Sequence, residues 1–287
     1  MLFKNEKIQQ QFNLNGYVVV PFLNESEVKT LRDFFFEKHP SIPDGFYSSS
    51  FNTDETHKQS VNQKIETVLG ENVTASFNSI KKLGGCFLNK QPGVQSEMPI
   101  HQDWTVVDEP NFDSITVWIP LQDVNETNGA IQVINGSHRF HHALRSPSLH
   151  DPFKNVQSEL RKDLKLLPMK AGEAFIFSQA LLHASPANHS NEPRIAVTYG
   201  LIDAKAQLMF YHNEGGKMEQ YFVDENFFQQ YNTQIGQRPN FGSLQKTFEY
   251  EQHFVSSNEY QKMKQNSTMV GNGLIKIASM KKVYLHF

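Results

Sequence analysis

His101 and Asp103, separated by a single residue in the stretch MPIHQDWTVV, have the side-chain types and spacing of two metal ligands. In an extended strand, residues i and i+2 project to the same side, so an imidazole nitrogen and a carboxylate oxygen can reach one ion. The spacing alone has little specificity. With 12 His and 30 acidic residues in 287 positions, composition gives about one such pair by chance. His212 and Glu214 form a second pair.

A third ligand has to come from elsewhere in the chain, and His183 is the best placed. It follows one predicted strand and lies 11 residues before Arg194, which opens the next. Two His and one carboxylate with open coordination positions form the facial triad of non-haem Fe(II) oxygenases. A lone His between apolar residues is more often part of a core, so the specific signal is the combination. His183 and Arg194 stand 80 and 91 residues after Asp103.

The elements that would position these residues are mostly short strands. Apolar runs recur between Gly, Pro, Asn and Asp, and SITVWIPL alternates, with Ile115, Val117 and Ile119 facing one way and Thr116 and Trp118 the other. This pattern predicts a mainly β fold, an antiparallel sandwich or barrel, with flanking helices. The predicted strands are 83–89, 114–121, 129–135, 173–178 and 194–202.

Helices are predicted near the N-terminus. Asn24 and Glu27 form a capping-box signature that begins one helix after the predicted strand GYVVVPF. Two more helices are predicted over residues 3–13 and 58–70, the second ending at Gly70.

Composition excludes several classes of protein. The net charge of −3 and the absence of a basic run argue against a nucleic-acid or acidic-membrane binder. The single cysteine, Cys86, excludes an internal disulfide and a multi-cysteine zinc site. No apolar run approaches 18 residues, so a soluble, cytoplasmic protein is expected.

Two segments have no clear periodicity. Residues 137–170 are rich in His and Arg and are predicted to be a lid or an insertion, whereas 203–287 are predicted to pack on the core as part of a single domain, 1–287. Basic residues of the lid could attract an anionic substrate such as a carboxylate, phosphate or CoA thioester, but a solvated polar loop explains them more simply. They are His138, Arg139, His141, His142, Arg145, His150 and Lys154.

The chain resembles the phytanoyl-CoA dioxygenase family of Fe(II)- and 2-oxoglutarate-dependent oxygenases over residues 11–202. The resemblance rests on FNLNGYVVVPFLNESEVKTLR, CFLNKQPG, IHQDW, ITVWIPLQDVNETNGAIQVINGSHR and AGEAFIFSQALLHASPANHSNEPRIAVTY, in this order. Residues 203–287 resemble nothing that we can assign.

This resemblance implies a double-stranded β-helix core, a relative of the jelly roll and the cupins. It implies that His101, Asp103 and His183 bind Fe(II) and that Arg194 pairs with the far carboxylate of the cosubstrate 2-oxoglutarate. The chemistry agrees, because three protein ligands leave positions for a chelating 2-oxo acid and O2, and a planar guanidinium binds a carboxylate bidentately.

Other residues match family positions less specifically. Trp118 and Cys86 match positions lining the cosubstrate pocket, although a Trp and a Cys within strands are most often core residues. Asn89 is a candidate for the 1-carboxylate, and Gln102 and Trp104 are candidates for substrate contact.

One position departs from the family pattern. Related enzymes often carry a hydroxyl residue two positions after the arginine, and here that position is Ala196. Either Tyr199 or Ser185 supplies the missing hydrogen bond, or nothing does.

The expected reaction is hydroxylation of a small molecule, because family relatives that halogenate replace the carboxylate with a small residue and Asp103 is present. One alternative is a catalytically silent jelly-roll binding module. Another is a cupin-like metalloenzyme that uses no 2-oxo acid and takes a further ligand from His212 or Glu214. No nucleic-acid, membrane or protein partner is predicted.

Overall fold

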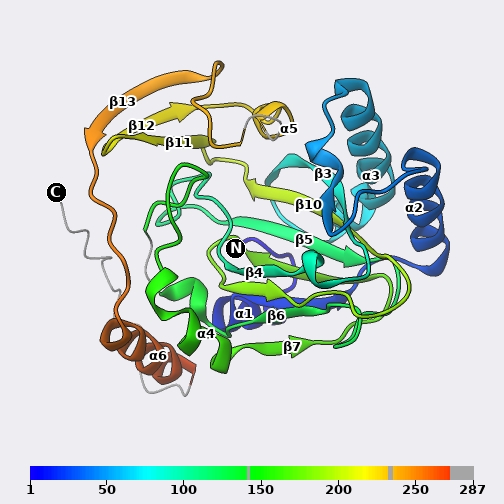
Figure 1. Cartoon of the computed structure of the whole chain (residues 1–287), viewed down its shortest axis with the longest axis horizontal. Coiled ribbons are helices and arrows are strands. Elements are labelled where there is room, and N and C mark those ends of the chain that lie inside the picture. The colour runs from blue at the N-terminus through cyan, green and yellow to red at the C-terminus, as the bar shows by residue number, and fades with distance from the viewer. Residues whose placement is uncertain (141–142, 232–234, 272–287) are drawn as a thin grey trace.

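Two antiparallel sheets form the centre of the fold in the computed structural model, which describes residues 1–140, 143–231 and 235–271 (Figure 1). The major sheet has the order β1-β8-β5-β10-β3-β2 and the minor sheet the order β4-β9-β6-β7. The major strands are β1 (Tyr17–Pro21), β2 (Phe46–Ser48), β3 (Ile80–Lys90), β5 (Ser114–Pro120), β8 (Glu173–Ser178) and β10 (Arg194–Asp203). The minor strands are β4 (Met98–His101), β6 (Ile131–Val133), β7 (Lys165–Leu167) and β9 (His183–Ser185).

The two sheets pack face to face as a jelly roll. Trp118, Phe175 and Phe177 of the major sheet share a hydrophobic cluster with Ile131 and Val133 of the minor sheet. The alternation predicted for β5 is confirmed, since Ile115, Val117 and Ile119 lie in the other core, between sheet and helices, whereas Thr116 and Trp118 face the space between the sheets. A single strand therefore supplies both the outer core and the wall of a cavity.

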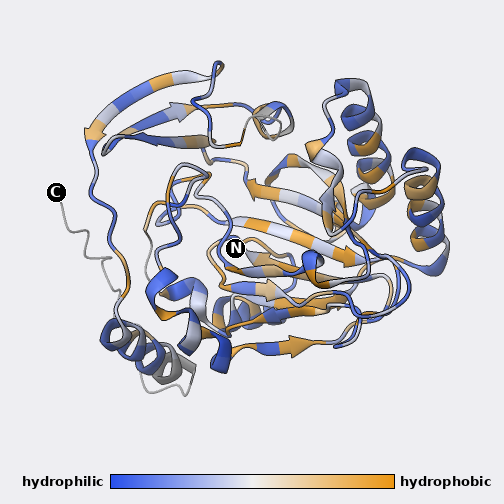
Figure 2. Cartoon of the chain, viewed as in Figure 1, coloured by the Kyte–Doolittle hydropathy of each residue, from blue (hydrophilic) through white to orange (hydrophobic). Residues whose placement is uncertain are grey.

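Three helices cover the outer face of the major sheet. They are α1 (Glu6–Asn15), α2 (Glu25–Lys38) and α3 (Glu55–Ser76). The capping box of Asn24 and Glu27 is present at the start of α2, as predicted. Figure 2 shows that α2 and α3 are hydrophobic on one side and hydrophilic on the other, which is the pattern of helices that bury one face.

The prediction that the third helix ends at Gly70 is wrong. The helix continues to Ser76 because a row of buried apolar residues at helical spacing extends past Gly70. They are Val61, Ile65, Leu69 and Val73. Gly70 itself lies where an added Cβ would meet nothing within 4 Å. The intrinsic penalty of a helical glycine, about 1 kcal/mol, is therefore outweighed by packing on the opposite face.

The chain after β10 forms a third sheet, with the order β11-β12-β13, and two helices. These elements are β11 (Met209–Glu214), β12 (Lys217–Phe222), α5 (Phe227–Tyr231), β13 (Ser243–Glu249) and α6 (Ser257–Gly271). Phe210 and Tyr221 pack with Val107 and Ile202 of the core, so the described part of 203–287 lies on the β core. Residues 272–287 are outside the described part of the chain.

Residues 137–170 contain the 3-10 turns η3 (Ser137–Arg139) and η4 (Lys154–Val156), helix α4 (Gln157–Asp163) and strand β7. Two further 3-10 turns, η1 (Ser49–Phe51) and η2 (Val94–Ser96), flank the major sheet and β4. Across the described ranges, no helix combines the length and apolar character needed to cross a membrane.

Candidate active site

Strands β4 and β9 bring the three predicted ligands together. These strands pair antiparallel with His101 opposite His183, and Asp103 follows two residues after His101. Asp103 Oδ1 lies 3.8 Å from Nε2 of His101 and 3.9 Å from Nε2 of His183. Among the described residues these three are the group whose ligand atoms lie close enough to share one ion, all within 4.8 Å of one another.

Both imidazoles are held with Nε2 toward the other ligands. Nδ1 of His101 donates to the carbonyl of Pro99 at 2.8 Å, and Nδ1 of His183 donates to the carbonyl of Leu181 at 2.9 Å. A carbonyl can only accept, so the proton sits on Nδ1 and the lone pair on Nε2 is available to a metal. Burial, and next the neighbouring His101, lowers the pKa of His183 to about 4, so its ring is neutral at pH 7.

The carboxylate of Asp103 is fixed through its second oxygen. The Thr116 hydroxyl donates to Oδ2 at 3.2 Å, which leaves Oδ1 directed at the two imidazoles. This division suits a monodentate metal ligand, with one oxygen for the ion and the other for a neighbouring hydrogen bond.

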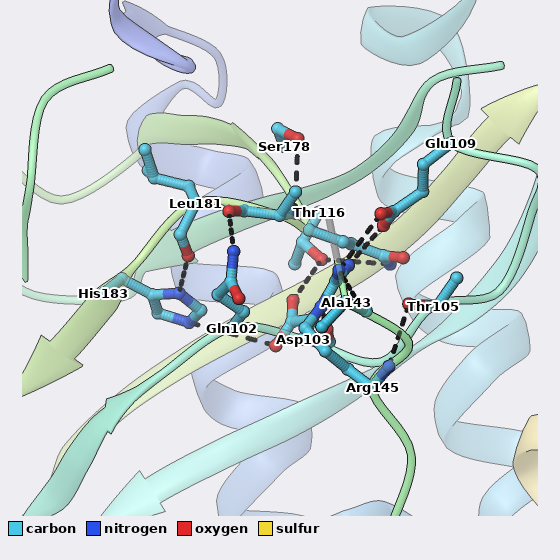
Figure 3. Close-up of polar contacts among 12 residues, drawn as sticks. Gln102, Asp103, Thr105, Glu109, Thr116, Ala143, Arg145, Ser178, Leu181 and His183 are labelled. Atoms are coloured by element: carbon cyan, nitrogen blue, oxygen red, sulfur yellow. Dashed lines mark hydrogen bonds and ion pairs between the residues drawn. The ribbon is translucent and has the colours of Figure 1, made fainter. Parts of the chain in front are cut away.

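A buried ion pair holds the main chain of Asp103 (Figure 3). Arg145 Nε donates to the Asp103 carbonyl at 2.7 Å, while its two terminal nitrogens bind the carboxylate of Glu109. The Arg145 and Glu109 side chains are only 4% and 9% exposed. Main-chain and hydroxyl hydrogen bonds also join Thr105 to Arg145. The loop after β4 is therefore anchored from residue 145, which sequence reasoning grouped with a lid.

A cavity of about 510 Å³ opens from these ligands between the sheets. Thr116 and Trp118 of β5, Cys86, Leu88 and Lys90 of β3, and Arg194 of β10 line it, together with His101, Asp103 and His183. Phe46, Phe51, Trp104, Phe228 and Ile235 also line it. Its volume lies within the range of small-molecule sites, roughly 300–1,000 Å³.

Arg194 is buried in the cavity wall, and two of its hydrogen-bond donors have no partner. It is 1% exposed, one terminal nitrogen lies 3.4 Å from the Ser185 hydroxyl, and the guanidinium lies 5.1 Å from the Trp118 ring. The remaining nitrogens, Nε and Nη1, are buried without a hydrogen-bond partner. Burial lowers the pKa of Arg194 to about 9, so it stays charged at pH 7. A buried cation with unpaired donors fits an anionic ligand.

Lys90 is a second buried basic residue of the cavity, and it was not identified from the sequence. Its Nζ donates to the carbonyls of Ser185 and Pro186, each at 2.7 Å. Burial, and next the charge of Arg194, lowers its pKa to about 6. A carboxylate bound beside Arg194 and Lys90 would raise the pKa of Lys90 again and so favour its charged form.

The predicted candidate Asn89 does not line the cavity. Successive residues of a strand face opposite sides, and on β3 the side chains of Cys86, Leu88 and Lys90 take the cavity side. Asn89 therefore faces the other side, where its amide is buried without a partner. The same alternation, counted from Cys86, was the signal that would have identified Lys90.

The other candidate residues from the sequence also differ in whether they line the cavity. Trp118, Cys86, Gln102 and Trp104 all line the cavity. Of the two possible replacements for the missing hydroxyl at Ala196, Ser185 lines the cavity beside Arg194, whereas Tyr199 packs in the core between the major sheet and the helices.

The second His–acid pair lies away from the site. His212 and Glu214 are on β11 of the third sheet, and Glu214 forms an ion pair with Arg238. Neither residue belongs to the cluster that could share an ion.

No described residue of 137–170 lines the cavity. Its basic side chains bind other parts of the fold instead. Arg139 donates to the carbonyls of Asn13 and Leu14, and Lys154 lies 3.6 Å from the ring of Phe254. The described part of the predicted lid is thus outside the cavity wall, and His141 and His142 are outside the described residues.

Comparison with known proteins agrees with this geometry. Residues 12–196 match the sequence model of the phytanoyl-CoA dioxygenase (PhyH) family. Phytanoyl-CoA dioxygenase 1 of Oryza sativa subsp. japonica is 25% identical over 249 residues, which cover 68% of this chain and 87% of the relative. Phytanoyl-CoA dioxygenase domain-containing protein 1 of Danio rerio is 30% identical over 131 residues, 43% of this chain and 45% of that protein.

Solved structures show the same fold. The non-heme alpha ketoglutarate dependent carbocyclase SnoK from nogalamycin biosynthesis aligns with a TM-score of 0.52 and 19% identity, over 71% of this chain and 86% of SnoK. HygX from Streptomyces hygroscopicus, crystallised with nickel, 2-oxoglutarate and hygromycin B, aligns with a TM-score of 0.50 and 15% identity, over 70% of this chain and 88% of HygX. The predicted jelly-roll core is confirmed, and the chain belongs to the phytanoyl-CoA dioxygenase family of iron- and 2-oxoglutarate-dependent oxygenases.

Proposed function

We propose that this enzyme hydroxylates an unactivated C–H bond of a small molecule, consuming 2-oxoglutarate and O2 and releasing succinate and CO2. One observation carries the proposal. The convergent atoms of His101, Asp103 and His183 line the same cavity as Arg194, whose buried guanidinium has two nitrogens without partners.

The three ligands would hold Fe(II) through Nε2 of each His and Oδ1 of Asp103. Hydrogen bonds to Pro99 and Leu181 keep the imidazoles in the binding tautomer before the metal arrives. Three protein ligands on an octahedral ion leave three positions for other ligands. Bound iron supplies the redox chemistry that couples decarboxylation of the 2-oxo acid to oxidation of the substrate.

Arg194 would bind the far carboxylate of 2-oxoglutarate through its unpaired donors, with Ser185 steadying the guanidinium. Lys90 would add a second positive charge by taking up a proton once the carboxylate lies beside it and raises its pKa. Trp118 and Cys86 would form the sides of this part of the cavity.

Asp103 favours hydroxylation over halogenation. Its carboxylate stands at the position that a halide would need in order to bind the metal beside two His ligands. A small-molecule substrate is supported by the cavity volume of about 510 Å³. HygX, which has the same fold, was crystallised with 2-oxoglutarate and hygromycin B.

The test is the binding of 2-oxoglutarate to iron-loaded protein without oxygen, followed by its visible charge-transfer band and by calorimetry. The wild type is expected to give the band, and Arg194→Gln to weaken 2-oxoglutarate binding by roughly 100-fold, because charge-assisted hydrogen bonds are lost. Arg161→Gln is the matched control, since Arg161 lies on helix α4, is 58% exposed and does not line the cavity. Iron-loaded wild type that binds no 2-oxoglutarate would refute the proposal.

The two alternatives make different predictions. A silent binding module would keep its cellular function in the His101→Ala variant, and a cupin-like metalloenzyme would turn over equally well without 2-oxoglutarate. The position of His212 on the third sheet leaves the second alternative without its extra ligand.

A further inference from the structure

We infer that the substrate is an uncharged molecule that presents a hydrogen-bond donor, such as a hydroxyl or amide N–H, to Gln102 and Gln179. This inference rests on the proposed function, because it concerns the part of the cavity left after iron and 2-oxoglutarate are bound.

Under the proposed function, the charged side chains that line the described part of the cavity bind iron or 2-oxoglutarate. Among the described residues that line it, the Lys, Arg, His, Asp and Glu side chains are Lys90, His101, Asp103, His183 and Arg194. Iron accounts for three of them and the cosubstrate carboxylate for the other two. The rest of the described wall is neutral, so a phosphate, carboxylate or ammonium on the substrate would be desolvated without a counter-charge.

Gln102 offers a hydrogen-bond acceptor whose orientation is fixed. Its Nε2 donates to the carbonyl of Ala180 at 2.5 Å, and since that carbonyl can only accept, the amide cannot be turned round. The other end of the amide, Oε1, is buried without a donor. Figure 3 shows Gln102 between Asp103 and His183, next to the position expected for the metal.

Gln179 offers a second acceptor, because the orientation of its amide is fixed as well. The Asp103 carboxylate accepts from the Thr116 hydroxyl, so the Thr116 oxygen is free to accept from Gln179 Nε2, at 3.5 Å. This chain of donors leaves Gln179 Oε1 as an acceptor, and it too is buried without a partner in a side chain that is 8% exposed. Both oxygens are buried without a donor, so a substrate that offers a donor at this end of the cavity would supply the missing hydrogen bond.

The remaining wall favours an apolar body. Phe46, Phe51 and Trp104 line it together with Phe228 and Ile235.

On one side the wall includes glycines and the apolar side chain of Leu83. Gly84 and Gly200 are paired across β3 and β10, and both line the cavity. The Leu83 side chain, which also lines the cavity, lies against Gly200, where an added Cβ would come within 3.1 Å of the Leu83 Cβ. A compact ring carrying one donor matches such a surface.

The test uses small probes with Zn(II)-loaded protein saturated with 2-oxoglutarate, titrated by saturation-transfer NMR. Cyclohexanol supplies a donor, cyclohexanone has the same size but only an acceptor, and cyclohexanecarboxylate adds a charge. The alcohol is expected to bind roughly tenfold more tightly than the ketone and the carboxylate. Gln102→Met and Gln179→Met should bring the alcohol-to-ketone ratio toward one, whereas Gln63→Met, on the exposed side of α3, should leave it unchanged.

Three results would overturn the inference: no binding of cyclohexanol, equal binding of alcohol and ketone by the wild type, or binding of the carboxylate as tight as that of the alcohol. The charge-transfer band of Fe(II) and 2-oxoglutarate, measured on the same preparations, reports separately on the proposed function. A normal band with the wrong probe selectivity refutes the substrate class alone, whereas a missing band refutes the oxygenase assignment.

Discussion

Replacing Arg145 by Met is expected to weaken iron binding although Arg145 is not an iron ligand. Its Nε holds the carbonyl of Asp103 at 2.7 Å, and its terminal nitrogens face Glu109 in a pair that is less than a tenth exposed. Loss of a side chain that orients a metal ligand lowers metal affinity by roughly 10- to 100-fold. Breaking a buried ion pair destabilises the fold by about 3–5 kcal/mol.

The two effects are separable by a second substitution. Arg145→Met with Glu109→Leu removes the uncompensated buried charge and should recover part of the lost stability. It should not recover iron affinity, because the Asp103 carbonyl still lacks its donor. Anaerobic calorimetry with Fe(II) and urea unfolding measure the two quantities.

Arg161→Met is the control for both measurements. Arg161 is 58% exposed and lies 3.5 Å from Glu97, so its loss should change stability by less than ~1 kcal/mol. The reasoning is refuted if Arg145→Met folds and binds Fe(II) as tightly as the wild type. It is also refuted if the double variant regains iron affinity together with stability.

Three more predictions follow from groups described above. Binding of 2-oxoglutarate should be accompanied by uptake of a proton above pH 6, because the anion raises the pKa of Lys90 from about 6. Calorimetry in buffers of different ionisation enthalpy measures the proton uptake, and Lys90→Met should abolish it. The free energy of unfolding of metal-free protein should rise by up to roughly 3 kcal/mol as pH rises from about 4 to 6.5. The reason is that His183 has a pKa of about 4 in the folded state, so the unfolded chain binds more protons in that window. Urea unfolding of wild type and of His183→Gln measures the difference. Gly70→Ala should stabilise the fold by about 0.5–1 kcal/mol, since an added Cβ meets nothing within 4 Å, and a thermal melt would show it.

Each of these has a clear contrary outcome. Proton uptake that persists in Lys90→Met would mean that another group responds to the cosubstrate. An equal pH dependence in His183→Gln would assign the acid sensitivity elsewhere. A lower melting temperature for Gly70→Ala would mean that the backbone at this position requires glycine.

The sequence predicted His101, Asp103 and His183 as one cluster from local strand signals taken in combination, because the His101–Asp103 spacing alone has little specificity. His101 and Asp103 share a strand-like spacing, and His183 follows a recognisable strand at a fixed distance from Arg194. The capping box at Asn24 and the alternation along β5 are local signals too, and the structure agrees with both.

The missed features depend on contacts between distant segments. Arg145 and Glu109 are 36 residues apart, and no pattern in either segment marks the other as a partner. The choice between Asn89 and Lys90 is different, because alternation along β3 counted from Cys86 places Lys90 on the cavity side. Gly70 looked like a helix end because local propensity was weighed without the buried face that carries α3 past it.

The pairing of His101 with His183 has a consequence for the folding of the minor sheet. An ion bound to both would cross-link two points 82 residues apart in the chain, closing a long loop in the manner of a disulfide. The strands it would join are short, four residues in β4 and three in β9, so their own hydrogen bonds hold them weakly. A slip of one residue between them would turn one imidazole to the opposite face and destroy the cluster. A bound ion would therefore favour one alignment of these strands, and metal binding would add to the stability of the minor sheet.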